Sequence, residues 1–502
     1  MPEVDQGGAE AAQGSSIAHK AVSGAMWSTA AGLVARALSL VGTVLIVRFL
    51  TPSEYGEIQS ASVVVLTASQ FATLGVGPYI ISFPRSGRVV AFHATLIHAT
   101  LGALALILTW AFADKVGGYF DAPTLQKFVP GLAAAVFLDR LSFMAERPVV
   151  RDLGFRTVSA SRTVGELAYT IVSVFFAWRG HGAMSVVYGN VARSILRLVV
   201  MLIMSDWREW AQPARIDRAV LSTLFSYGTV VTVESIAEFG SRRWDNLLVA
   251  RYFGSGVTGN YVLAYNLADL PSIQIGEQIS DVLLASYGHV DPEHRPAAVL
   301  RAATLMTLIM APLSIGLGAI GPSIAHAFFP PEWILLGPML TLLPIVLVSR
   351  PIGAVYSGFL MIVRGPKPPM VGEVVAVVLM MVTIVLFART DPMMVVAMVG
   401  LSSAARTLVF MWYVQKTDGV TIMAGLRRFL PIFAACIPMF AAVWGVRQGL
   451  LSAGIDRPLL SLPLEITAGA IAYVLFVLLL SRGPALDMLT LVLGVLRRKL
   501  RR

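Results

Sequence analysis

The sequence predicts an all-α membrane protein with about fourteen transmembrane helices. Of its 502 residues, 56% are hydrophobic and only 14% are charged, whereas a soluble domain carries about 25% charged residues. The mean hydropathy is +0.73. The apolar residues also form runs long enough to cross a hydrocarbon core about 30 Å thick, which takes roughly 20 helical residues. Lipid is therefore the expected surrounding of most of the chain.

The spans follow one another with short connections that contain turn residues, such as Thr51-Pro52-Ser53 and Gly365-Pro366-Lys367. No connection is long enough to form a second, soluble domain. In chain order the predicted spans are 21–50, 54–82, 89–113, 128–148, 159–178, 183–204, 224–253, 257–284, 299–328, 335–362, 369–388, 393–414, 427–446 and 463–481.

An internal duplication groups these spans. Leu45-Ile46-Val47-Arg48-Phe49-Leu50 resembles Leu248-Val249-Ala250-Arg251-Tyr252-Phe253, and Val164-Gly165-Glu166 recurs as Val371-Gly372-Glu373 at a similar distance along the chain. Repeated halves are common in transporters, whose substrate site lies near the midplane where the halves meet. We therefore expect two six-helix lobes around a central cavity, at 21–204 and 224–414, joined by a cytoplasmic linker at 205–223 and followed by two further helices within 427–481.

The distribution of Lys and Arg predicts the orientation, because cytoplasmic connections carry the excess of these residues. With the amino terminus inside, the cytoplasmic side receives most of the basic connections and the tail 482–502, which ends in a basic run. The tail 1–20 has no basic region of the kind that opens a secretory signal peptide. Both termini are expected in the cytoplasm, with the chain in a bacterial inner membrane.

Several classes of function are disfavoured by the sequence. The net charge is +10, but the basic residues are dispersed between apolar runs, so nucleic-acid binding is not expected. The single cysteine, Cys436, excludes a disulfide within the chain, and the histidines lack metal-ligand spacing. No phosphate-binding loop of the ATPase kind is present. We expect no catalytic residues, no metal site and no cofactor.

Charged residues inside the seventh span are the leading candidate site. Glu234, Glu238, Arg242 and Asp245 are spaced by four, four and three residues, so they share one helical face, with Arg243 about 100° away. Hydropathy alone would place 241–245 in a loop, whereas register with the first span places it in the membrane. A charge at the bilayer centre costs about 2.5–3.5 kcal/mol even on lenient scales, so this face should border a cavity. A self-neutralised stripe that holds helices together is the alternative.

Other intramembrane charges are sparser. Arg36 in the first span is expected to face the cavity, while Asp139 beside Arg140 suits either a local pair or contacts with neighbouring helices. The remaining candidates in the predicted spans are Glu166, Arg193, Arg197, Asp269, Arg350, Glu373 and Arg406.

The mixture of arginines and acids suggests the transported chemistry. Arginine binds phosphate oxygens with a planar fork and keeps its charge when desolvated. A carboxylate in a partly dry cavity can exchange a proton or hold Na⁺. We therefore assign an anionic substrate to Arg36, Arg242, Arg243, Arg140 and Arg350, and possible H⁺ or Na⁺ coupling to Glu234, Glu238, Asp245 and Asp269.

Two segments carry a family resemblance. Arg48-Phe49-Leu50-Thr51-Pro52-Ser53-Glu54-Tyr55-Gly56 and Asp245-Asn246-Leu247-Leu248-Val249-Ala250-Arg251-Tyr252-Phe253-Gly254, with Gly259-Asn260-Tyr261 and Tyr265 beyond, resemble the polysaccharide transporter family. These are the Wzx-like oligosaccharide flippases of the multidrug/oligosaccharidyl-lipid/polysaccharide exporter superfamily. The resemblance spans about residues 20 to 480 and identifies the family better than the substrate.

The resemblance implies two lobes around a cavity that opens alternately to each side, with a lipid-tail groove at the last two helices. It implies an undecaprenyl-diphosphate-linked saccharide as cargo, moved from the cytoplasmic to the periplasmic leaflet, with Arg36, Arg242 and Arg243 placed to hold the pyrophosphate. Membrane lipids and a polysaccharide polymerase or export machinery are the implied partners. A cation-coupled multidrug antiporter of the same superfamily and a membrane-embedded glycosyltransferase or polysaccharide ligase are the alternatives.

Overall fold

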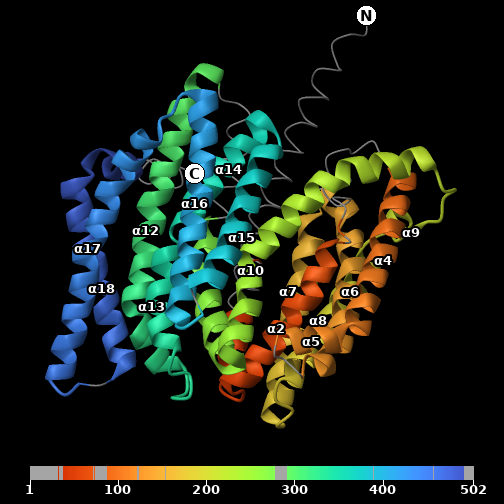
Figure 1. Ribbon diagram of the computed structural model, residues 1–502, viewed down its shortest axis with the longest axis horizontal. Coiled ribbons are helices and arrows are strands. Elements are labelled where there is room, and N and C mark those ends of the chain that lie inside the picture. Colours follow the sequence, from red (N-terminus) through yellow and green to blue (C-terminus); the bar gives the residue numbers. More distant parts are fainter. Residues whose placement is uncertain are drawn as a thin grey trace, which may run out of the picture. The chain divides into compact units, whose positions relative to one another are not determined.

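The computed structural model describes residues 32, 38–71, 73, 87–120, 124–152, 154–276, 291–387, 389–455 and 457–490, and in these ranges it contains helices and no strand. Contacts divide the chain into two compact units, Met1–Ile236 and Ala237–Arg502, with the boundary inside helix α10 (Figure 1). The predicted all-α fold class is confirmed.

The first unit contains five helices at the positions of the second to sixth predicted spans, with ends shifted by a few residues. Two short helices, α5 and α9, lie between the longer ones. Of the first predicted span, 21–50, the structure describes helix at Leu38–Val47. The helices are α2 (Pro52–Phe71), α4 (Gly87–Ala111), α5 (Ala113–Tyr119), α6 (Leu125–Arg151), α7 (Phe155–Trp178), α8 (Met184–Met204) and α9 (Arg208–Ala211).

The predicted linker 205–223 is structured and lies against α4 and α6. Glu209 of α9 binds Arg88 at 2.8 Å and Arg151 at 3.5 Å, and His93 Nε2 accepts the backbone N–H of Asp217 at 2.8 Å. The Asp217 side chain then accepts the N–H of Ala219, which is the bond of a helix N-cap. This cap starts α10 (Arg218–Ala268) six residues earlier than the predicted start at 224.

Helix α10 holds the seventh predicted span and the start of the eighth. It is helical through 241–245, which confirms that this charged segment is not a loop. The break predicted between 253 and 257 falls at Gly254, whose φ of 79° and ψ of 175° interrupt the helix and suit only glycine. Because the chain turns there, Tyr261 reaches back to Asp245 and Arg243 to Asn266.

The second unit continues from α10 through a π-helical turn at Ser272–Gly276 to seven long helices. The predicted span 335–362 corresponds to the single apolar span Leu336–Arg364. Within it, Val348 separates two helical segments, because Pro351 has no N–H to offer the Leu347 carbonyl there. These helices are α12 (Arg295–Phe328), α13 (Leu336–Leu347), α14 (Ser349–Arg364), α15 (Lys367–Phe387), α16 (Pro392–Asp418), α17 (Ile422–Ser452) and α18 (Pro458–Leu480) (Figure 1).

Nine helices in the described ranges are long and apolar enough to cross a membrane, or ten if Arg218–Ser226 and Val231–Ala268 form one bent span. Helices α2 and α7 are not among them, because Glu54 and Glu57 in α2 and Arg156, Arg162 and Glu166 in α7 lower their hydropathy. The chain is a multi-pass membrane protein. The total of fourteen spans stays a prediction, because segments such as 21–31 and 277–290 lie outside the described residues.

Glycines let α12 and α13 approach closely. A Cβ on Gly318 would lie 2.5 Å from the carbonyl oxygen of Thr341, whereas a Cβ on Gly316 would meet only the end of Met439 at 3.8 Å. Backbone atoms cannot yield as a flexible side chain can. We expect Gly318→Ala to lower the free energy of unfolding by about 1–3 kcal/mol, and Gly316→Ala to leave it unchanged or raised, since alanine favours helix. Thermal unfolding in detergent distinguishes the two variants, and equal melting temperatures would contradict the close contact.

Candidate transport site

The buried Arg350, the partly exposed Arg242 and the buried Asp269 form the centre of a polar network in the second unit. Arg242 Nη1 and Arg350 Nη1 each lie 3.9 Å from Asp269 Oδ2, beyond ordinary hydrogen-bond distance. The Arg350 guanidinium also lies over the Tyr265 ring, at 5.1 Å from its centroid, and Arg350 Nη2 donates to the Ser241 carbonyl at 3.2 Å. Side-chain exposure is 7% for both Arg350 and Asp269. The network therefore lies inside the helical bundle.

The more exposed side of this network is formed by the part of α10 that precedes Gly254. Arg242 Nη2 pairs with Glu238 at 3.3 Å, and the two side chains are 33% and 50% exposed. Arg242 thus contacts a buried acid and an accessible one. A solute that reached this part of the second unit would meet Arg242 before Arg350.

A second chain of bonds ties α10 to α15 and α16. Glu373 accepts from Arg406 Nη1 at 2.7 Å and from the Ser241 hydroxyl at 2.9 Å. Both ionised side chains are nearly buried. The Ser241 carbonyl also accepts a hydrogen bond from Arg350, so the two networks join at Ser241.

Asp245 lies apart from the Arg242 pair, although both were predicted on one stripe. Asp245 is fully buried, and its Oδ2 accepts from the Tyr261 hydroxyl at 2.5 Å. Its Oδ1, like the side-chain oxygens of Asn246 and Asn260, has no hydrogen-bond partner among the described residues. Arg243 pairs with Asn266 at 3.1 Å. The chain turns at Gly254, and the part of α10 that follows this glycine covers these residues. They are thereby separated from the rest of the predicted stripe.

In the first unit, the adjacent Asp139 and Arg140 do not pair with each other. Asp139 accepts from Arg197 at 3.1 Å. Arg140 contacts His98 Nε2 at 3.3 Å and donates to the Ser69 hydroxyl, and no carboxylate pairs with it in the described part of the chain. His98 therefore makes a polar contact with Arg140 in addition to its stacking on the Phe143 ring.

Sequence reasoning missed Glu146, the acid at the centre of the first unit's ion pairs. It is fully buried and contacts Arg197 at 2.8 Å and Arg162 at 3.1 Å. Its position inside the predicted span 128–148 was the available signal. Glu166 pairs with Arg193 at 3.6 Å, so an acid from the fifth span meets an arginine from the sixth, as Glu373 and Arg406 do in the second unit.

The remaining predicted site residues are Arg36 and Glu234. Arg36 lies outside the described residues. Glu234 lies on α10 in the first unit and is half-buried. Their expected places in a cavity stay predictions.

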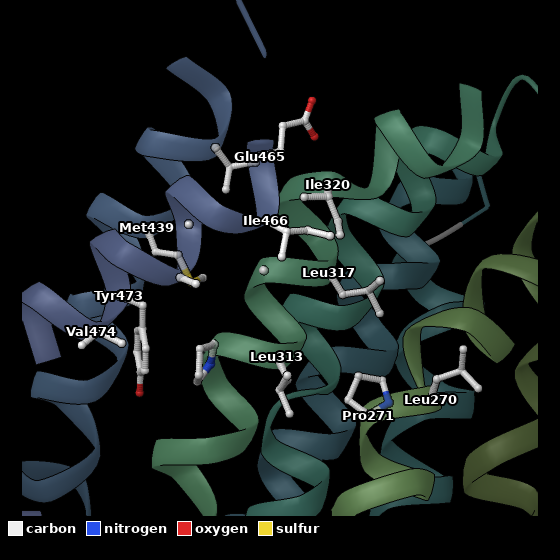
Figure 2. Close-up of a pocket in the computed structure, with 15 residues that line it drawn as sticks. Leu270, Pro271, Leu313, Leu317, Ile320, Met439, Glu465, Ile466, Tyr473 and Val474 are labelled. Carbon is white, nitrogen blue, oxygen red and sulfur yellow. The ribbon is translucent and has the colours of Figure 1, made fainter. Parts of the chain in front are cut away.

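An apolar groove of about 520 Å³ runs between α12, α17 and α18. Figure 2 shows Met439, Tyr473 and Val474 on one side and Leu313, Leu317 and Ile320 on the other. The Tyr473 hydroxyl donates to the Leu308 carbonyl at 2.8 Å, which Pro312 leaves without its usual helical donor. At one end Glu465 accepts from Ser323 at 2.8 Å. The groove has the shape and lining that suit an apolar chain.

Fold and site together define a class. Buried charges in membrane-spanning helices usually mark the path of a solute or ion, and here they lie beside an apolar groove in a multi-pass helical protein, which is the plan of a membrane transporter.

Comparison with known proteins identifies the family. The profile of the family described as "Polysaccharide biosynthesis protein" matches residues 45–338, more than half of the chain, and the protein belongs to this family. Its sequence is 24% identical over 471 residues to the succinoglycan biosynthesis transport protein ExoT of Rhizobium meliloti (strain 1021), covering 91% of this chain and 92% of that protein. It is 23% identical over 349 residues to the lipopolysaccharide biosynthesis protein WzxC of Escherichia coli (strain K12), covering 69% and 70%.

The fold is also similar to a solved structure of the Lipid II flippase MurJ in an inward closed conformation. The TM-score is 0.73 at 14% sequence identity, with 91% of this chain and 99% of that chain covered. This likeness concerns the fold alone. It agrees with the predicted all-α polytopic fold.

Proposed function

We propose that this protein is a lipid-linked oligosaccharide flippase, which moves an undecaprenyl-diphosphate-linked saccharide from the cytoplasmic to the periplasmic leaflet during polysaccharide synthesis. The observation that carries the proposal is the pair Arg242 and Arg350, two guanidinium groups beside the buried Asp269 within apolar helices of a member of this family. Guanidinium groups bind phosphate oxygens through paired hydrogen bonds. The relatives ExoT, a succinoglycan biosynthesis transport protein, and WzxC, a lipopolysaccharide biosynthesis protein, support the choice of cargo.

The chain supplies a place for each part of such a cargo. Arg242 and Arg350 receive the diphosphate, with Arg243, Arg140 and Arg36 as further basic residues along the path. The groove of α12, α17 and α18 accommodates part of the polyprenyl chain, because its lining is apolar (Figure 2). In this proposal the saccharide passes through a cavity that opens alternately to each side of the inner membrane, as the family resemblance implies. Both termini lie in the cytoplasm.

Asp245 is the residue best suited to ion coupling. It combines complete burial with one bonded and one unbonded carboxylate oxygen, and the oxygens of Asn246 and Asn260 on the same helical hairpin also lack partners. Such oxygens can receive H⁺ or Na⁺. Glu234 and Glu238 offer further carboxylates on the part of α10 that precedes Gly254. Transport then needs no cofactor beyond the ion gradient.

The proposal is tested in a strain that lacks this protein. We expect undecaprenyl-linked repeat units to accumulate on the cytoplasmic leaflet and the wild-type gene to clear them. Arg242→Ala and Arg36→Ala should each stop export while the protein stays in the membrane at its normal level, because each removes a charged phosphate contact. Leaflet-specific labelling of the lipid-linked saccharide and quantitative immunoblotting of membranes measure the two quantities.

Arg389→Ala is the matched control, since Arg389 is an exposed arginine that contacts the Tyr252 ring. It should support export like the wild type. Normal polymer production in both Arg242→Ala and Arg36→Ala would refute the assignment of these arginines to the diphosphate. Absence of trapped repeat units in the deletion strain would refute the flippase proposal itself.

A further inference from the structure

The arginine pair of the second unit has more donors than acceptors. Arg350 Nε and Nη1 and Arg242 Nε are buried and have no hydrogen-bond acceptor among the described residues. Oδ1 of Asp269, the acid between them, is also without a partner. Unsatisfied buried donors on charged groups are costly. This part of the bundle therefore favours an additional anion.

Asp269 holds the arginines loosely. Both of its contacts to them measure 3.9 Å, whereas the Glu373–Arg406 pair in the same unit measures 2.7 Å. A charge-assisted hydrogen bond is normally about 2.7–2.9 Å long. The Asp269 carboxylate thus offsets part of the positive charge of the arginines but leaves several of their hydrogen-bond donors without an acceptor in the described part of the chain.

The backbone around Asp269 is irregular. Pro271, two residues later, has no N–H, and the chain then forms a π-helical turn at Ser272–Gly276. Turns of this kind are frequent at functional sites. A carboxylate at the end of a regular helix and beside such a turn can change position at lower cost than one in mid-helix.

We propose that Asp269 is a placeholder anion. It occupies Arg242 and Arg350 when no cargo is bound, a cargo phosphate displaces it from the guanidinium groups, and its return to them promotes release of the cargo. This inference rests on the proposed function, and it assigns Asp269 to competition with the cargo rather than to ion coupling. The partly exposed Arg242 receives the phosphate first, and Arg350 follows as Asp269 withdraws.

Binding measurements test the placeholder. The full-length protein is purified in detergent and titrated with farnesyl diphosphate, a short polyprenyl diphosphate without sugar. Asp269→Asn should lower the Kd about tenfold, because it removes the competing charge from two guanidinium groups. Asp269→Ser should act in the same direction, which guards against a folding defect in one variant. In cells both variants should bind cargo yet export it more slowly, because release is no longer assisted.

Asp391→Asn is the control with the same chemical change. Asp391 is exposed and caps α16 through the N–H of Met393, a bond that asparagine also makes, so its Kd should equal that of the wild type. If wild type binds the probe and neither Asp269 variant binds it more tightly, the placeholder is refuted and the phosphate site stands. If neither wild type nor variants bind it, the phosphate site fails and the placeholder fails with it.

Discussion

Replacing Arg350 by glutamine should reduce export of the lipid-linked saccharide by about 30- to 100-fold. The estimate corresponds to about 2–3 kcal/mol for a charged hydrogen-bonded contact. Among the described residues, Arg350 has two nitrogens without acceptors, and its contact with Asp269 measures 3.9 Å, so its charge is available for a cargo phosphate. The rate of appearance of saccharide on the outer leaflet, divided by the amount of protein in the membrane, gives the effect.

Two further variants separate the causes of that loss. Arg350→Lys should recover part of the rate, since lysine keeps the charge but loses the planar fork. Arg389→Gln should export normally, because this arginine is exposed and contacts the Tyr252 ring rather than Asp269. An Arg350→Gln protein that is present at normal levels and exports at the wild-type rate would contradict a phosphate-binding role for Arg350.

Glu373→Ala should destabilise the protein by about 3–5 kcal/mol, because it leaves a buried guanidinium without its acid. Glu373 accepts from Arg406 and Ser241 at once, and Arg406 is only 6% exposed. The second unit has to rearrange or admit water to solvate that charge. Equilibrium unfolding in mixed detergent micelles measures the difference in free energy.

Two further variants test whether the Glu373–Arg406 ion pair is the cause of this loss of stability. Glu238→Ala removes the acid of a half-exposed pair, whose contribution should be about 0–1 kcal/mol. Replacing both Glu373 and Arg406 by leucine should recover most of the lost stability, since an apolar pair leaves no uncompensated charge. A double variant as unstable as Glu373→Ala would show that the ion pair is not the cause.

Much of the fold could be predicted from local sequence. Each apolar run that is long enough to cross a membrane became a helix where the structure describes it, and Gly254 marks the break predicted between the seventh and eighth spans. The differences arise from single residues. Asp217 caps α10 earlier than hydropathy suggests, and Pro351 interrupts the helical hydrogen bonds between α13 and α14 within the single span Leu336–Arg364.

The candidate site was predictable in its members but less so in its pairing. Arg242, Arg350 and Asp269 were each selected because a charged side chain within an apolar span is costly unless it has a partner or a function. The structure brings these three together. The same rule applied to Glu146, which nevertheless was overlooked. That Asp139 pairs with Arg197, and Asp245 with Tyr261, depends on residues 58 and 16 positions away, which no local pattern specifies.

The sequence by itself determined that this chain is a helical membrane protein, that charged residues lie within its spans, and that it resembles the polysaccharide transporter family. The first two follow from composition and spacing, because lipid imposes the length and polarity of a helix segment by segment. The resemblance rests on the segments that begin at Arg48 and Asp245. Only the tertiary structure decided which charges are satisfied, as at Glu373, and which remain unsaturated, as at Arg350. The physical reason is that the cost of a buried charge depends on the few atoms within about 4 Å of it, and folding alone brings those atoms from distant parts of the chain.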